Sequence, residues 1–260
     1  MKVYKYLKFD DGAKCILKDG TLKFTSPANF NDPFDCRSTF NNELALQFYY
    51  KKYLDRFLDD HRHLSPAKRL LEIKKFKESI KNKIKNGVLS EHLLSGIGVC
   101  CFTTDPESVL MWSHYADHHR GFVIEFDVID VLSKPTEEIA NKVDNPEFNL
   151  FMFEVAYSDN MPIRTFINES PRDIIYQNFL TKASGWKYEN EYRCISHHKG
   201  AGIHKFDTSL VTAVYAGVRM SDEDFSSLQR LVDDFSILTK NKISLRKAKM
   251  VDGKYKLSVL

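Results

Sequence analysis

The segment from 184 to 193 holds the densest group of side chains in the sequence that could perform chemistry. Glu189, Glu191 and Arg193 alternate with other residues there, and an extended strand would place all three on one face. Two carboxylates and a guanidinium on one face can form a charged network or bind one ligand. The large rings nearby, which suit stacking against a planar ligand, are those of Trp186, Tyr188 and Tyr192. We therefore expect an acidic site, the alternative being a solvated edge strand with a surface Glu–Arg pair.

A second candidate group is a histidine pair, His114 and His118. Residues spaced i, i+4 share one face of a helix, so two imidazoles could bind one metal ion there. No third ligand sits at a matching spacing, and histidines near a helix end are also favoured by the helix dipole. A metal-dependent hydrolase or nuclease is therefore kept only as an alternative function.

Strands and helices that must position these residues follow one another along the chain. Strands are predicted near residues 3–8, 21–24, 98–102, 121–126, 151–156, 191–195, 211–216, 243–248 and 255–259. Helices are predicted around residues 13–17, 105–116, 171–183 and 221–238, the last starting at a capping-box pattern. Because short turns join several strands, we expect one α+β domain over residues 1–260, built on a strongly twisted mixed sheet.

A helical pattern interrupts this alternation at about residues 43–95. Between Lys51 and Lys85 there are 12 Lys/Arg and 5 Asp/Glu, an excess of seven positive charges, whereas the whole chain carries +3. The segment is thus predicted to be a basic helical insertion. The insertion is either a solvated amphipathic surface or a surface that contacts phosphates or another acidic partner. If it contacts phosphates, the chain could instead be a non-catalytic nucleic-acid-binding module, which is kept as an alternative function.

Composition and missing motifs narrow the class of protein. A chain of 260 residues with 43% hydrophobic residues can bury a core, and its mean hydropathy of −0.38 and lack of a long apolar run argue against a membrane span. The first residues lack the pattern of a secretory signal, and five cysteines without paired spacing suggest reduced thiols, so a cytoplasmic location is expected. P-loop, dinucleotide-binding, zincin and nucleophile-elbow motifs do not occur.

Four motifs, taken in order, closely resemble the DUF2971 family of mostly bacterial proteins. The resemblance spans nearly the whole chain, and its most specific pieces are Phe-Asn-Asp-Pro-Phe and Trp-x-x-Glu-x-Glu-Tyr-Arg. The family name implies no activity. The motifs are Tyr4-Lys5-Tyr6, Ser26-Pro27-x-x-Phe30-Asn31-Asp32-Pro33-Phe34-Asp35, Cys101-Phe102-Thr103 with Met111-Trp112-x-His114-Tyr115-Ala116-Asp117-x-His119-x-Gly121-Phe122, and Lys182-x-x-x-Trp186-x-x-Glu189-x-Glu191-Tyr192-Arg193.

The order of three of these pieces also resembles ADP-ribosyltransferases. That resemblance implies that Glu191 stabilises an oxocarbenium-like state at the NAD ribose while Glu189 activates the nucleophile. It implies a cation at Lys5 for the pyrophosphate or ribose, although Lys replaces the usual Arg or His there. The remaining NAD-binding candidates are Tyr4, Tyr6, Thr103, Thr104, Phe30, Asn31, Asp32, Trp186 and Arg193. The expected function is an ADP-ribosyltransferase-like enzyme that uses NAD to modify a nucleic acid or protein.

Overall fold

The computed structural model describes residues 1–87, 94, 96–129, 148–166 and 169–259, and these form two compact units. The sheet unit comprises Met1–Ser26, Ile97–Val155 and Ser184–Leu260. The helical unit comprises Pro27–Gly96 and Ala156–Ala183.

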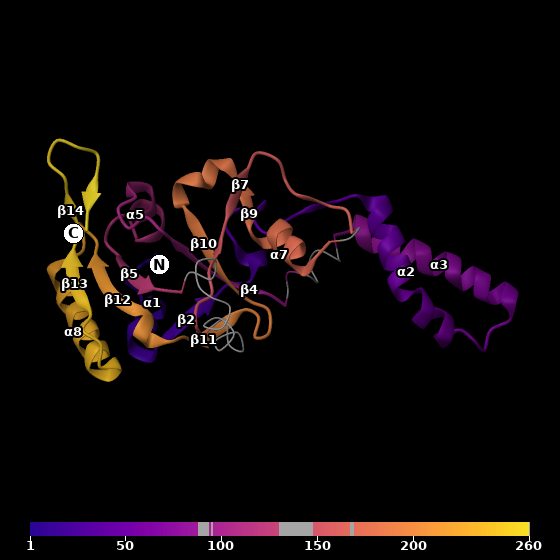
Figure 1. Cartoon of the computed structure of the whole chain (residues 1–260), viewed down its shortest axis with the longest axis horizontal. Coiled ribbons are helices and arrows are strands. Elements are labelled where there is room, and N and C mark those ends of the chain that lie inside the picture. Colours follow the sequence, from indigo (N-terminus) through magenta and orange to yellow (C-terminus); the bar gives the residue numbers. More distant parts are fainter. Residues whose placement is uncertain (88–93, 95, 130–147, 167–168, 260) are drawn as a thin grey trace. The chain divides into compact units, whose positions relative to one another are not determined.

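The sheet unit is built on a seven-stranded sheet with the order β13-β12-β5-β1-β4-β10-β6 among the described residues (Figure 1). All neighbouring strands run antiparallel except β12 and β13, which are parallel, so the sheet is mixed. The predicted α+β class and mixed sheet are confirmed. In chain order the strands are β1 Lys2–Leu7, β4 Gly98–Thr103, β5 Phe122–Asp127, β6 Phe153–Glu154, β10 Glu191–Ser196, β12 Val211–Ala216 and β13 Ser244–Lys247.

Two-stranded pairs complete the strand structure of this unit. Strand β2 (Thr21–Phe24) pairs with β11 (Gly202–Lys205), and β14 (Lys249–Met250) pairs with β15 (Leu257–Ser258). The prediction missed β11 because its sequence has no clear apolar alternation. These pairs extend the unit beyond the strands of the main sheet.

Three α-helices of the sheet unit begin at side-chain caps. Asp10 caps α1 (Asp11–Asp19) through the Ala13 backbone N–H, and Ser221 caps α8 (Asp222–Thr239) through Asp224. Gly20 follows α1 with φ +61°, the left-handed conformation that glycine adopts without strain. Helix α5 (Val109–Tyr115) begins at Ser108 rather than at the predicted Asp105, because the Asp105 carboxylate instead accepts the Glu107 N–H in a local turn.

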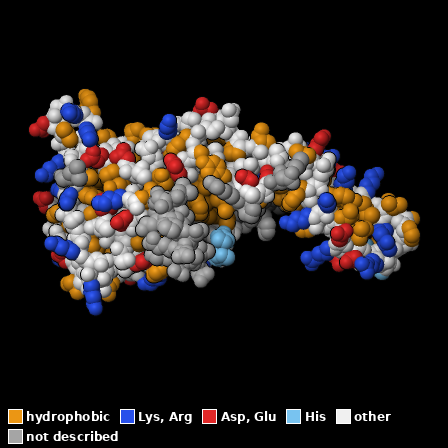
Figure 2. Space-filling view, viewed as in Figure 1, with side chains coloured by type: hydrophobic (Ala, Val, Ile, Leu, Met, Phe, Trp, Pro, Cys, Tyr) orange, Lys and Arg blue, Asp and Glu red, His pale blue; other side chains and the backbone are white. Residues whose placement is uncertain are grey.

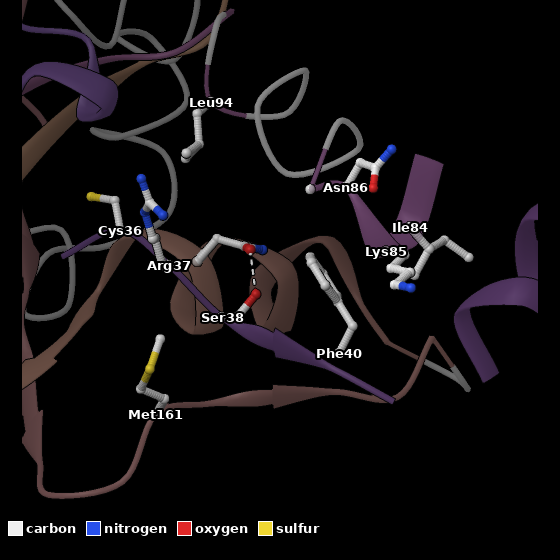
Figure 3. Close-up of a pocket in the computed structure, with 11 residues that line it drawn as sticks. Cys36, Arg37, Ser38, Phe40, Ile84, Lys85, Asn86, Leu94 and Met161 are labelled. Carbon is white, nitrogen blue, oxygen red and sulfur yellow. Dashed lines mark hydrogen bonds between the residues drawn. The ribbon is translucent and has the colours of Figure 1, made fainter. Parts of the chain in front are cut away.

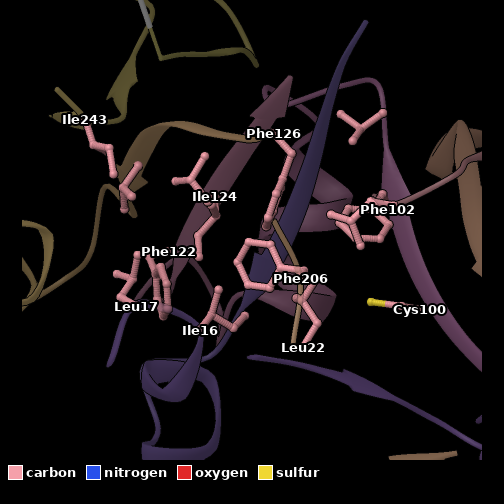
Figure 4. Packing of buried hydrophobic residues seen from close by; sticks show 14 of the residues in the cluster. Ile16, Leu17, Leu22, Cys100, Phe102, Phe122, Ile124, Phe126, Phe206 and Ile243 are labelled. Carbon is pink, nitrogen blue, oxygen red and sulfur yellow. The ribbon is translucent and has the colours of Figure 1, made fainter. Parts of the chain in front are cut away.

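Alternation along the strands divides the core into two clusters. Val3 belongs to the cluster that includes Ile16 of α1 and Phe235 of α8, whereas Tyr4 belongs to the cluster on the other face, which includes Trp112 of α5. Figure 4 shows part of the first cluster, in which Phe102 of β4 and Ile124 and Phe126 of β5 pack with residues of α1 and β2. Both faces of the sheet are therefore covered, and a polar side chain on a central strand must find its partners inside the protein.

The helical unit is dominated by a pair of helices, α2 (Asn42–Asp60) and α3 (Pro66–Lys85), which lie side by side (Figure 1). Asn41 caps α2, and α3 begins at the predicted Ser65-Pro66 start. Part of the predicted 43–95 segment, residues 88–93 and 95, lies outside the described residues. The other elements are the 3₁₀ turn η1 Pro27–Asn29, α7 Pro171–Phe179, and the parallel pairs β3 (Thr39–Phe40) with β8 (Ile163–Arg164) and β7 (Ala156–Ser158) with β9 (Thr181–Ala183).

Two predicted elements differ in the structure. The strand predicted over 151–156 is split: β6 joins the main sheet, and β7 joins the helical unit. The helix predicted over 171–183 ends at Phe179, and the chain then forms β9, because the Leu180 carbonyl accepts a hydrogen bond from Ala156. Among the described helices, none is long and apolar enough to cross a bilayer.

Candidate functional site

The three sequence pieces that resemble a transferase site occupy three neighbouring strands, β1, β4 and β10. Thr103 is opposite Tyr4 on one side and opposite Glu191 on the other. Residues directly opposite in antiparallel strands point to the same face, so these three side chains form one row across the sheet. The exposed fractions of Tyr4, Thr103 and Glu191 are 9%, 0% and 4%. Residues far apart in sequence are thus gathered in a buried polar row.

The carboxylate of Glu191 is held by Arg193, two residues further along β10. The guanidinium donates from Nε to Oε1 at 2.7 Å and from Nη2 to Oε2 at 2.9 Å, and Arg193 is fully buried. A bidentate pair of this kind fixes the plane of the carboxylate as well as its position. The expectation that Glu191 and Arg193 share a face is confirmed, and the surface-pair alternative is excluded by their burial.

Glu189 is not on the same strand face as Glu191, contrary to the prediction. It ends the 3₁₀ segment η2 (Ser184–Glu189), and Asn190 has φ +43°, which interrupts the extended backbone before β10 begins. Glu189 is nevertheless buried and accepts a 2.6 Å hydrogen bond from the Tyr115 hydroxyl of α5. The two acids are therefore only two residues apart in sequence but are held by different elements.

Aromatic side chains connect η2 with α5 beside Glu189. The ring centroids of Trp186 and Tyr188 are 6.1 Å apart, and those of Tyr188 and His114 are 6.3 Å apart. Trp186 and Tyr188 are half-buried, so their ring faces could still meet a planar ligand. Two of the quoted motifs, which are about 70 residues apart in sequence, therefore contact each other here.

The side chains of Lys5 and Tyr6 do not contact the residues of the row in the same way, because each of them donates to a backbone carbonyl. Lys5 alternates with Tyr4 and lies on the opposite face, where its Nζ is 5.1 Å from the Phe102 ring centroid and donates to the Cys101 carbonyl at 3.0 Å. The structure therefore does not bring Lys5 together with Glu191. Tyr6 points to the same face as Tyr4, but its hydroxyl donates to the Asp105 carbonyl and its ring packs edge-on against Trp112.

Sequence reasoning missed a fourth member of the row, Glu125 on β5. It is opposite Tyr4, only 3% exposed, and accepts hydrogen bonds from the hydroxyls of Thr212 at 2.6 Å and Tyr215 at 2.8 Å. Lys2 Nζ is 2.8 Å from its carboxylate. The signal in the sequence was a single acid in the apolar run Phe-Val-Ile-Glu-Phe. The row thus has a carboxylate at each end, about 14 Å apart over three strand spacings.

The charges in this row change the acidity of its members. Burial raises the pKa of Glu125, but hydrogen bonds from Lys2, Thr212 and Tyr215 outweigh it and leave the pKa below its ordinary value. Burial and the nearby Glu125 raise the pKa of Tyr4 to about 12. Burial, and then the charge of Glu191, raise the pKa of the Cys101 thiol well above its ordinary value. At neutral pH the row therefore holds an ionised Glu125 beside a neutral Tyr4 hydroxyl, and Cys101, two residues before Thr103 on β4, is a neutral thiol.

Apart from Thr103, the remaining predicted residues lie outside the row. Thr103 Oγ1 accepts the Asp105 N–H at 3.0 Å, and the Thr104 N–H donates to the Asn190 carbonyl. Phe30, Asn31 and Asp32 belong to the helical unit, where Asp32 Oδ1 accepts the Phe34 N–H and Asn31 is exposed. In the same unit Lys182 pairs with the buried Asp35 at 3.7 Å.

The histidine pair does not have the helical geometry that the metal-binding alternative requires. Helix α5 ends at Tyr115, and His118 follows in a left-handed conformation with φ +54°, so His114 and His118 do not project from one helix. Over the part of the chain that the structure describes, no group of three or more His, Cys, Asp or Glu side chains is arranged to hold a metal ion. The geometry therefore gives no support to the metal-dependent alternative.

Comparison with known proteins gives one match. The family model of DUF2971, a protein of unknown function, matches residues 111–194, which include α5 from Met111 onward, Glu125 and the Trp186–Arg193 segment. This match supports the resemblance for the motifs within those residues, whereas Tyr4-Lys5-Tyr6 and the Ser26–Asp35 motif lie outside it. No curated protein and no solved structure matches the chain.

Proposed function

We propose that this chain is an ADP-ribosyltransferase-like enzyme that takes NAD as a substrate and modifies a nucleic acid or protein. The observation that supports this proposal is the row formed by Tyr4, Thr103 and Glu191 on three neighbouring strands. A transferase of this kind needs its three short motifs at one place although they are distant in sequence. The antiparallel order β1-β4-β10 provides that arrangement.

The chemistry assigned to Glu191 follows from its charge and position. As the bond between nicotinamide and ribose C1′ breaks, nicotinamide leaves with the bonding electron pair and positive charge develops on the ribose. A fixed carboxylate in a water-poor site stabilises that charge more strongly than the same group in water. Arg193 acts as a positioning residue, because its two hydrogen bonds set the orientation of the carboxylate before the substrate arrives.

Glu189 is proposed to activate the acceptor group. A hydroxyl or amine that attacks C1′ must lose its proton, and a positioned carboxylate can take that proton as a general base. The Tyr115 hydroxyl, 2.6 Å from Glu189 Oε1, orients the group from the neighbouring helix. Trp186 is the ring proposed to stack on the nicotinamide. Lys5 has no part in this proposal, since it lies on the other face of the sheet.

The test is nicotinamide release from NAD by the purified full chain, together with transfer of label from adenine-labelled NAD to RNA, DNA and protein mixtures. Glu191→Gln should lower the rate about 10²-fold or more, the usual effect of removing one such group. Glu154→Gln is the matched control, because Glu154 is an exposed acid on β6, the strand next to β10. The control should keep the wild-type rate.

NAD binding is measured separately from turnover, so that a fold defect in Glu191→Gln cannot hide the result. A ligand that binds only the folded state raises the melting temperature, and the effect grows with the logarithm of ligand concentration relative to Kd. Millimolar NAD should therefore raise the melting temperature of the wild type and of Glu154→Gln alike. The proposal is overturned if NAD does not stabilise the wild-type chain and the wild-type chain releases no nicotinamide.

A further inference from the structure

The positive charge of the predicted insertion is concentrated on one helix. Helix α3 carries eight Lys/Arg and two Glu, whereas α2 carries three Lys/Arg and four Asp/Glu. The excess of six charges on α3 is therefore larger than that of the whole chain, which is +3. Figure 2 shows Lys and Arg side chains beside hydrophobic ones on the visible face of the α2–α3 hairpin. The positive charge of the hairpin is therefore carried by α3 and is not shared between its two helices.

Four of the lysines form a stripe along α3: Lys74, Lys77, Lys81 and Lys85. With 100° and 1.5 Å per residue, they span an arc of about 80° and a length of about 16 Å. All four are exposed. Among the described residues, only Lys81 of the four has a carboxylate within 4.0 Å, that of Glu78 at 3.8 Å, and both of those side chains are more than half exposed. The stripe is thus a regular row of cations with little internal neutralisation.

Lys85 also lines a cavity of about 370 Å³ within the helical unit (Figure 3). Arg37 lines the same cavity and adds a second cation. The hydroxyl of Ser38 donates to Asn178 Oδ1 at 2.8 Å, and Asn86 contributes a further amide. The cavity therefore combines cations with neutral hydrogen-bonding groups at the C-terminal end of the lysine stripe.

We propose that the helical unit binds a single-stranded nucleic acid, with its phosphates along the Lys74–Lys77–Lys81–Lys85 stripe and a terminal nucleotide in the cavity beside Arg37. Successive stripe lysines lie about 4.5–6 Å apart along the helix axis, so they can contact successive phosphates of an extended strand. The amide and hydroxyl groups of the cavity can form hydrogen bonds with the edge of a base or the hydroxyls of a sugar. An acyl chain would offer these groups no hydrogen bond. The proposal does not depend on the transferase activity.

The first experiment measures fluorescence anisotropy of a labelled 12-nucleotide oligouridylate with the full chain at 50 and 200 mM salt. Lys77→Gln/Lys81→Gln should weaken binding at least tenfold at 50 mM salt. It should also reduce the slope of log affinity against log salt by about 1.4, since each lost phosphate contact contributes roughly 0.7 for single strands. The matched control is Lys68→Gln/Lys75→Gln, which removes two charges from the opposite side of the same helix and should change affinity less than threefold. Helix content is checked for both variants by circular dichroism.

A second arm tests the cavity. A terminal phosphate on the oligouridylate, placed at the 5′ end in one titration and at the 3′ end in another, should tighten binding at one of the two ends. Arg37→Gln should abolish that preference and leave the affinity for the unphosphorylated strand within about twofold. Equal affinity of the wild type for all three strands would remove the cavity from the proposal.

Three outcomes overturn the stripe itself. In the first, the wild type does not bind the oligouridylate at 50 mM salt. In the second, the stripe and control variants lose the same affinity for the oligouridylate. In the third, the stripe lysines bind anionic lipid vesicles and the oligouridylate does not compete for that binding. Because no NAD is present in these titrations, failure of this proposal and failure of the proposed transferase function are distinguishable. Nicotinamide release can persist in Lys77→Gln/Lys81→Gln whatever its affinity for nucleic acid.

Discussion

Glu191 and Arg193 form a bidentate ion pair within a single strand, and the two charged side chains are 4% and 0% exposed. Residues i and i+2 of a strand point to the same face, so the pair needs no contribution from a distant element to form. Its burial makes each partner dependent on the other, since a buried charge without a counter-charge is strongly unfavourable.

Removing the guanidinium should therefore destabilise the fold. Arg193→Met leaves a buried carboxylate without this partner, and we expect the free energy of unfolding to fall by about 3–5 kcal/mol. Urea unfolding followed by circular dichroism measures the change. Arg230→Met is the control, because Arg230 is exposed on α8, and its effect should stay within about 0.5 kcal/mol. A loss no larger than that of the control would contradict the burial of the pair.

The lowered pKa of Glu125 predicts that the folded chain loses stability in acid. Its pKa is lower in the folded chain than in the unfolded one, so the folded state binds fewer protons and stability must fall as the pH drops through both values. Urea unfolding at pH 6, 5, 4 and 3 should show a smaller decline for Glu125→Gln than for the wild type. Glu223→Gln, an exposed acid on α8, should follow the wild-type curve. Parallel curves for all three chains would mean that Glu125 does not contribute.

Cys101 should react slowly although it is only partly buried. Burial and the charge of Glu191 raise its pKa, so little reactive thiolate is present near neutral pH. Glu191→Gln removes the negative neighbour and leaves Arg193, which lowers the pKa, so alkylation by iodoacetamide should become faster. Peptide mass spectrometry gives the rate at Cys101 directly. Glu154→Gln should leave this rate unchanged, and an unchanged rate in Glu191→Gln would disprove the electrostatic link.

Gly121 should not tolerate a side chain. A Cβ built on it would lie 2.0 Å from the Leu7 carbonyl oxygen, a backbone atom of β1 that cannot move without disturbing the sheet. Gly121→Ala should destabilise the chain by about 2 kcal/mol or more, measured as a shift of the urea midpoint. Gly185→Ala is the control, because its Cβ would have no neighbour within 4 Å and its φ is not positive. Equal midpoints for the two variants would contradict this packing of Gly121 against β1.

Local chemistry explains why many elements could be predicted from the sequence. A capping serine before α8, a proline at the start of α3 and the glycine after α1 act within a few residues, so their effects are visible in the sequence itself. The same holds for the apolar runs of β4, β5 and β12. The i, i+2 spacing that joins Glu191 to Arg193 is equally local.

The tertiary structure decided which residues meet across strands. The choice of β4 and β5 as neighbours of β1, and their register, comes from packing over the whole sheet, and a shift of one residue would turn each side chain to the other face. That register separates Lys5 from the row and places Glu125 opposite Tyr4. The positive φ of Asn190, which separates Glu189 from β10, was likewise invisible in the sequence, because no residue type requires it there.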